Sequence, residues 1–278
     1  MNTITVDRNA GTAPAVNAGP ASVNALAGDA TWSATDASAF HMTVSRTASS
    51  RRPSNGSAQE GQVAIFGPQW TAGTTAEISD SDWAYVRETS ATSVALVDVD
   101  GNPTGFTATS GGGWKPEPGS DDLTLTGSLT GSFTLKDADG TTFTKVDPAT
   151  TIWEVSATYL PTTNFTTTVI SQKVTAGSST PARPQYVIPP TSAATVSTCQ
   201  TTPATVGCRM LEYVYASTTT ATSSASGDYV GQVKQIKQIK LWATTPGDSA
   251  STATVIAQYA YDTAGQLREE WAPGSAPR

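Results

Sequence analysis

The chain has 278 residues and an acidic balance, because 16 Lys and Arg against 23 Asp and Glu give a formal net charge of −7. It contains 47 Thr and 29 Ser, and since β-branched Thr is a poor helix former, this composition excludes a mainly helical fold. No apolar run approaches the roughly 18–20 residues of a membrane-spanning helix. The chain is acidic and contains no Lys/Arg-rich tract, which argues against nucleic acid as its main partner.

Residues 1–37 are rich in Ala, Gly and Pro and carry few large apolar side chains. We expect this segment to be a flexible arm. No apolar stretch of the signal-peptide type follows Met1, and the other end stops in a Pro-rich stretch. We therefore expect the chain to be a fragment of a longer protein.

A β-rich leading segment is predicted over residues 38–175. At its start, Phe40, Met42 and Val44 alternate with polar residues, which is the pattern of a half-buried strand. The only histidine, His41, falls on the other face and is interpreted as a surface residue. A single imidazole also excludes any site that needs two.

Two hairpins are predicted within this segment, around the turns Asp100-Gly101 and Asp139-Gly140. Each turn has the form D-x-D-G, and the spacing of its two aspartates could indicate a calcium site. An EF-hand loop needs further ligands that neither turn supplies, so we interpret the aspartates as turn residues and predict no metal and no cofactor.

Residues 176–208 form a long Pro/Thr-rich connection, which is the best candidate for a domain boundary. It holds the only two cysteines, Cys199 and Cys208. One interpretation is a disulfide across a short loop, and the other is a pair of reduced thiols in a turn. A zinc site would need more ligands than this segment offers.

Residues 209–278 contain two units of Tyr-x-Tyr followed by Gly-Gln-apolar and a second strand. The residues of these units to which we assign structural roles are Tyr213, Tyr215 and Gly231 in the first and Tyr259, Tyr261, Asp262, Gly265, Leu267 and Trp271 in the second. Two tyrosines spaced two apart share one face of a strand, while a Gly with positive φ and a capping Asp suit a tight turn. Each unit is therefore predicted to be a hairpin that must pack its aromatic face on a neighbour.

The run V-K-Q-I-K-Q-I-K-L, residues 233–241, has lysines at every third position. On a helix this spacing would give a basic stripe. In the hairpin interpretation, which we favour, the run is a strand with exposed lysines that protect it from aggregation.

The segment YAYDTAGQL, residues 259–267, resembles the Y-x-Y-D-x-x-G-R-L of the YD repeat in Rhs proteins, with Gln266 in place of Arg. The segment LEYVYA…GQVKQI is similar to a degenerate repeat. Phe66-Gly67-Pro68-Gln69-Trp70 resembles the F-G-P-G-W at the start of the region that precedes the repeats, with Gln69 in place of Gly. The two D-G hairpins also resemble elements of that region, so the likeness extends over residues 38–278.

The resemblance implies an all-β fold of antiparallel hairpins in a curved, open sheet, which would form a partial wall of a YD-repeat β shell. It implies a structural segment of a bacterial, secreted or cell-surface protein that encloses or presents a C-terminal effector such as a toxin. The expected partners are the remainder of the parent chain, its effector, and the cell wall or a glycan. No chemistry of its own is implied.

Two other functions are consistent with the residues. An adhesive or carbohydrate-binding module could use the tryptophans Trp32, Trp83, Trp114 and Trp242 to stack on sugar rings. A glycoside hydrolase would need two facing carboxylates, for which Glu88, Glu154 and Glu212 are available. The sequence does not pair these carboxylates or the turn aspartates with one another. Ser/His/Asp catalysis would require His41 and a G-x-S-x-G elbow that the sequence lacks, so we predict that the chain is not an enzyme.

Overall fold

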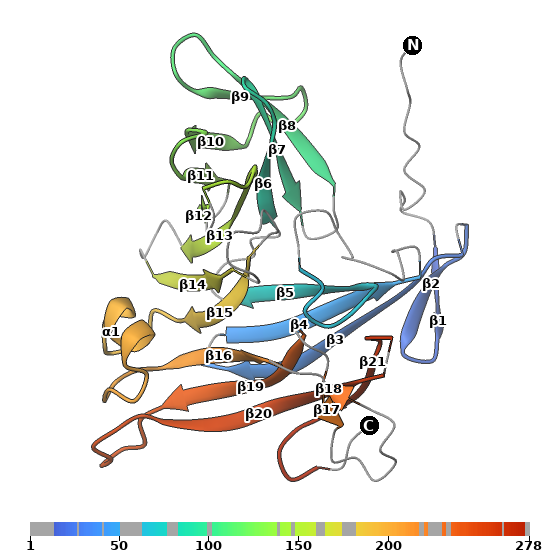
Figure 1. Ribbon diagram of the computed structural model, residues 1–278. Coiled ribbons are helices and arrows are strands. Elements are labelled where there is room, and N and C mark those ends of the chain that lie inside the picture. The colour runs from blue at the N-terminus through green and yellow to red at the C-terminus, as the bar shows by residue number, and fades with distance from the viewer. Residues whose placement is uncertain are drawn as a thin grey trace.

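The computed structural model describes residues 14–26, 28–40, 42–50, 63–76, 83–98, 102–137, 140–145, 148–159, 165–173, 182–216, 220–221, 230–231, 235–262 and 264–275. Within these residues the fold is all-β, with two antiparallel sheets and one short helix (Figure 1). Neither sheet is closed by the strand pairings found there, so the predicted class of antiparallel hairpins in an open, curved sheet is confirmed.

The five strands of the N-terminal sheet are ordered as in the sequence. They are β1 (Ala15–Ala18), β2 (Ala21–Asn24), β3 (Ala30–Ala39), β4 (Met42–Ser49) and β5 (Trp70–Ala76). We expected residues 1–37 to be a flexible arm, and this expectation is wrong for those of them that form the strands β1, β2 and β3. Small side chains do not prevent a strand from forming, because the ladder is made by backbone hydrogen bonds. Residues 1–13 lie outside the described part of the chain.

The main sheet has sixteen strands. They are β6 (Trp83–Ser90), β7 (Ser93–Asp98), β8 (Pro103–Ala108), β9 (Trp114–Pro116), β10 (Thr124–Gly127), β11 (Phe133–Lys136), β12 (Gly140–Thr144), β13 (Ile152–Tyr159), β14 (Thr166–Gln172), β15 (Arg183–Ile188), β16 (Met210–Tyr215), β17 (Thr220–Ala221), β18 (Val230–Gly231), β19 (Ile236–Ala243), β20 (Thr252–Tyr261) and β21 (Leu267–Trp271). Its longest path runs β17-β18-β20-β19-β16-β15-β14-β13-β6-β7-β8-β9. A branch of β10, β11 and β12 joins at β13, and β21 pairs with β20.

The hairpins predicted around the two D-x-D-G turns are present, since β7 pairs with β8 and β11 pairs with β12. Residues 236–241 of the run with lysines at every third position lie in the strand β19 and not in a helix, while residues 233 and 234 lie outside the described part of the chain. The expected connection over residues 176–208 differs from the structure, because β15 pairs with both β14 and β16. In the described part of this segment, residues 182–208, β15 therefore continues the sheet from β14 to β16.

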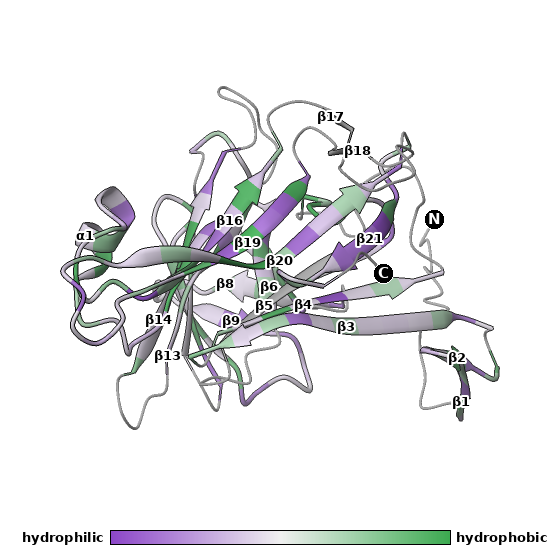
Figure 2. Cartoon of the chain, turned by 90° about the horizontal axis from the view of Figure 1, so that it is seen from below, coloured by the Kyte–Doolittle hydropathy of each residue, from purple (hydrophilic) through white to green (hydrophobic). Residues whose placement is uncertain are grey.

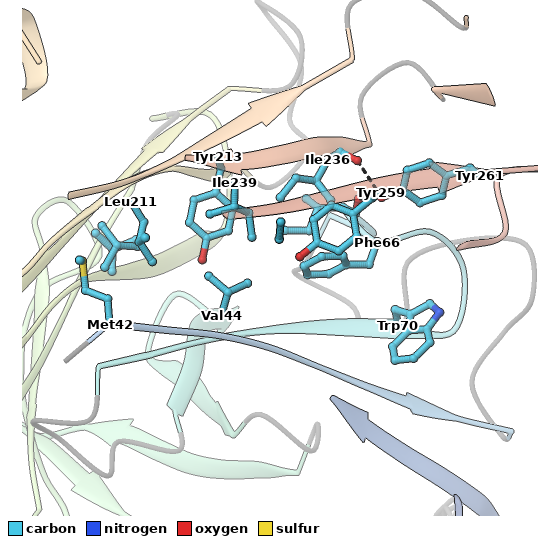
Figure 3. Packing of buried hydrophobic residues seen from close by; sticks show 14 residues of the cluster. Met42, Val44, Phe66, Trp70, Leu211, Tyr213, Ile236, Ile239, Tyr259 and Tyr261 are labelled. Atoms are coloured by element: carbon cyan, nitrogen blue, oxygen red, sulfur yellow. Dashed lines mark hydrogen bonds between the residues drawn. The ribbon is translucent and has the colours of Figure 1, made fainter. Parts of the chain in front are cut away.

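Two hydrophobic cores account for most of the buried apolar side chains. One lies among β6 to β13 and is built around Phe133 and Trp153, whose rings meet edge to face at 4.9 Å. The other lies between the N-terminal sheet and the strands β14, β15, β16, β19 and β20 of the main sheet (Figure 3). We call the face of the N-terminal sheet that carries Met42 and Val44 into this second core its inner face.

The helix α1 (Val196–Thr201) covers the opposite side of β15 and β16. Its N-cap is Thr195, whose hydroxyl accepts a hydrogen bond from the Thr198 backbone N–H at 3.2 Å. Cys199 and Cys208 form a disulfide that lies fully buried against Met210. The disulfide thus joins the helix to the start of β16.

Candidate functional site

Two of the segments that resemble Rhs motifs, Phe66–Trp70 and Tyr259–Leu267, meet at one junction between the two sheets, and this junction is the candidate site. Its first component is the turn between β20 and β21. Asp262 Oδ1 accepts hydrogen bonds of 2.9 Å from the backbone N–H groups of Ala264 and Gln266, while Gly265 adopts φ +80°. Burial opposes ionisation of Asp262, but these bonds and Arg268 outweigh it and hold its pKa below the usual value.

The tyrosines of β20 point into the core between the sheets (Figure 3). Tyr259 and Tyr261 are fully or almost fully buried, and so is Tyr213 on β16. Tyr215 is partly buried, and its hydroxyl donates to the Pro184 carbonyl at 2.6 Å beneath the Arg183 guanidinium. Burial is the main cause that raises the pKa of all four hydroxyls, so they remain protonated and uncharged.

The second component is the segment Ile65–Trp70, which enters β5. The ring of Phe66 packs edge to face on Tyr259 with centroids 5.2 Å apart. The Tyr261 hydroxyl donates to the Ile236 carbonyl at 2.9 Å and to the Ile65 carbonyl at 3.3 Å. The Ile65 carbonyl also accepts the Ile236 backbone N–H at 2.8 Å. The segment before β5 is therefore tied directly to β19 and β20.

Close backbone approach requires a glycine at one position of this contact, and a second position also has a positive φ. Gly67 adopts φ +90°, and a Cβ atom there would collide with the Gly265 carbonyl oxygen of the β20–β21 turn. The side chain of Gln235 donates to the same carbonyl at 2.9 Å. Gln69 also has a positive φ, of 70°, where the related F-G-P-G-W pattern has a glycine.

The third component is a charged group buried between the sheets. A β-bulge after Thr35 turns the side chain of Asp36 toward the inner face, where its two oxygens accept bonds of 3.0 and 2.9 Å from Arg46 Nε. The Tyr259 hydroxyl donates to Asp36 at 2.8 Å, and Arg46 also pairs with Glu270 on β21. Burial, followed by the nearby Asp36 carboxylate, raises the pKa of Glu270.

The surroundings of this charged group are aromatic. The Arg46 guanidinium lies 4.3 Å from the Trp70 ring centroid, which adds a cation–π contact to its ion pairs. The Tyr213 hydroxyl is buried close to Asp36 and has no hydrogen-bond partner among the described residues. An ion pair in this position contributes little net stability, but removing one partner would leave the other charge buried and unpaired.

Sequence reasoning did not identify Asp36, Arg46 or Glu270. Arg46 could have been found, since it follows Met42 and Val44 at the inward positions of an alternating strand. Phe40, which we placed in that strand, lies instead in the turn before it, with φ 51° and the Arg209 guanidinium 4.1 Å from its ring.

The other residues expected to matter lie beside the junction, elsewhere in the fold, or outside the described part of the chain. Leu267 and Trp271 are half-buried on β21, and Leu267 packs against the core between the sheets. Gly140 begins β12 against the Tyr159 ring, which would meet any Cβ atom there. Residues outside the described part of the chain are His41, Asp100, Gly101 and Asp139, and only the backbone is described at Gly231.

The candidate carboxylates of a hydrolase lie on three different strands. Glu88 is on β6, Glu154 on β13 and Glu212 on β16. Glu154 accepts a hydrogen bond from the Ala182 backbone N–H, and burial raises its pKa to about 7. Glu212 accepts a bond of 2.7 Å from the Trp242 indole and lies 3.8 Å from Lys240. These contacts give Glu154 and Glu212 separate surroundings.

Three of the four tryptophans considered for sugar binding use their indole N–H within the fold. Trp83 donates to Asp137 at 2.7 Å, Trp114 to the Gly127 carbonyl at 3.0 Å, and Trp242 to Glu212. Trp32 is different, because its side chain is 43% exposed and packs on Trp70 with centroids 5.5 Å apart.

A pocket of about 350 Å³ lies among β7, β8 and β9. Its lining combines hydroxyl side chains with Phe106, Lys115 and Glu117. Among the described residues no group of three or more His, Cys, Asp or Glu side chains is arranged to hold a metal ion.

No protein-family model matches the sequence of this chain, and no curated protein matches it.

Proposed function

We propose that the chain is a structural segment of an Rhs/YD-repeat protein and forms part of a β shell that encloses or presents a C-terminal effector. The observation that carries this proposal is the contact between Ile65–Trp70 and the β20–β21 hairpin. These two segments carry two of the motifs that resemble the family, and they lie almost 200 residues apart in the sequence. Here they pack on each other through Phe66, Tyr259 and Tyr261.

The proposal assigns the junction a mechanical task and no chemistry. The buried tyrosines and the charged group hold the last described hairpin over the N-terminal sheet. The proposed partners are the remainder of the parent chain and its effector, at the cell surface or outside the cell. No helix in the described residues is long and apolar enough to span a membrane.

The first test is the coding sequence on either side of this segment. The proposal expects further Y-D-x-x-G hairpins followed by a variable, toxin-like domain. The second test digests the intact parent protein with protease and compares it with the Phe66→Ala variant. The effector should survive in the parent and be degraded in the variant. A coding sequence without further repeats would refute the proposal.

A second candidate function is a surface module that binds carbohydrate, and the exposure of Trp32 favours it. The Trp32 indole packs against Trp70 at an interplanar angle of 60°, and its exposed part could stack on a sugar ring. A glycan array probed with the chain and with its Trp32→Ala variant tests this function. Binding that the substitution abolishes would support it, and the absence of any bound glycan would exclude it.

A further inference from the structure

Apolar side chains continue along the inner face of the N-terminal sheet beyond its core. Val16 pairs with Val23, and Val23 pairs with Ala30, so these residues share one face. Trp32, two residues further along β3, lies on that same face. Because Trp32 pairs with Ala48, and Ala48 with Trp70, this row is continuous with the side chains that pack against the main sheet.

The main sheet covers only part of this face. The main sheet extends over this face as far as Arg46, which forms an ion pair with Glu270 of β21. Beyond that point the side chains of Trp32 and Val16 are 43% and 59% exposed. Figures 1 and 2 show β1 and β2 projecting to one side of the molecule, past β21. An established interface between two sheets therefore ends with part of one apolar face uncovered.

The edge of the covering sheet is also open at this place. β21 pairs with β20 along one side, and no strand of the described residues pairs with its other side. Neighbouring strands lie about 4.8 Å apart and packed sheets about 10 Å apart. A strand added to β21 would thus extend the main sheet over the uncovered row.

We propose that the open edge of β21 and the inner face of β1, β2 and β3 together dock an extended segment of a partner polypeptide with apolar side chains at alternate positions. The edge offers backbone N–H and C=O groups for strand addition, and the face offers Trp32 and Val23 to alternate side chains. The covered part of the same face already receives such strands, since β20 presents Tyr259 and Tyr261 to it. The dock belongs to the chain in which the edge of β21 is free, because a further hairpin of a parent chain paired with β21 would occupy the same edge.

The test uses the full chain and the labelled peptide Lys-Thr-Tyr-Thr-Tyr-Thr-Val-Thr-Lys, in which apolar residues alternate with polar ones. A peptide of the same composition with its Tyr and Val residues placed together is the control. Fluorescence anisotropy should give saturable binding only for the alternating peptide. Hydrogen exchange at Leu267–Trp271 should slow when this peptide is present.

Two substitutions identify the surface. Trp32→Ser and Val16→Ser should each weaken peptide binding at least fivefold, and Val16 is exposed enough for its variant to fold. Val206→Ser is the matched control, since Val206 is a 50% exposed apolar residue in the disulfide loop. Its affinity should equal that of the parent chain.

Three results would overturn the proposal. The first is equal binding of the two peptides, and the second is an affinity unchanged by both substitutions at the apolar row. The third is a dimer of the free chain, detected by sedimentation, that Val16→Ser dissociates. That result would show that a second copy of this chain, and not a partner polypeptide, covers the surface.

Discussion

The buried side chain of Tyr261 should contribute more to stability than any other residue of the β20–β21 hairpin. It has no exposed surface, and its hydroxyl bonds to carbonyls on two different segments. Truncation of a buried aromatic side chain to Ala typically costs about 3–5 kcal/mol, so Tyr261→Ala should cost at least about 3 kcal/mol. Tyr261→Phe should cost about 1 kcal/mol, since the Ile65 carbonyl keeps its bond from Ile236 N–H while the Ile236 carbonyl loses the hydroxyl.

Urea unfolding of the two variants and the parent chain measures these differences. The midpoint should shift with little change in slope if only the folded state is affected. Thr254→Ala on the exposed part of β20 is the control and should lie within about 0.5 kcal/mol of the parent. A loss below about 0.5 kcal/mol for Tyr261→Ala would refute the packing of β20 on the N-terminal sheet.

Three further predictions concern the charged and covalent contacts. Arg46→Ala should cost about 3–5 kcal/mol because it leaves Asp36 buried and unpaired, whereas the double variant Asp36→Asn with Arg46→Met should recover most of this loss in a denaturant titration. Burial raises the pKa of Glu154 from 4.5 in the unfolded chain to about 7 in the folded one. Because the folded state then holds the proton more tightly than the unfolded state, the free energy of unfolding should fall by up to about 3 kcal/mol as pH rises from about 4.5 to 7. Glu154→Gln should remove that part of the pH dependence of the melting temperature, and an unchanged profile would contradict the burial. Loss of the disulfide by replacing Cys199 and Cys208 with Ser should cost about 2–3 kcal/mol, because the closed loop is short, and calorimetry under oxidising conditions would measure it.

The local elements of the fold could largely be predicted from the sequence. Alternating apolar residues and turn chemistry indicated β7, β8, β11 and β12. The β20–β21 turn could be predicted as well, because Asp262 and Gly265 act through neighbours only a few residues away.

The contacts between the two sheets could not be predicted in the same way. The position of Asp36 depends on a bulge opposite Ser45 and Val44, and nothing in the residues around Asp36 specifies which face it takes. The pairing of Arg46 with Glu270 joins residues 224 positions apart. Residues 15–18 and 21–24, which we expected to belong to a flexible arm, were misjudged for a related reason, since β1 and β2 are stabilised by backbone pairing and not by large side chains.

The packing of the first sheet on the last hairpins has a consequence for synthesis on the ribosome. Asp36 and Tyr259 are 223 residues apart, and at about 5–20 residues per second this interval lasts roughly 10–45 seconds. For most of that time the apolar side chains of β4 and Trp70 have been synthesised, but β19 and β20, which cover them, have not. A nascent chain of this protein should therefore depend on a chaperone that holds the early sheet until its cover is made.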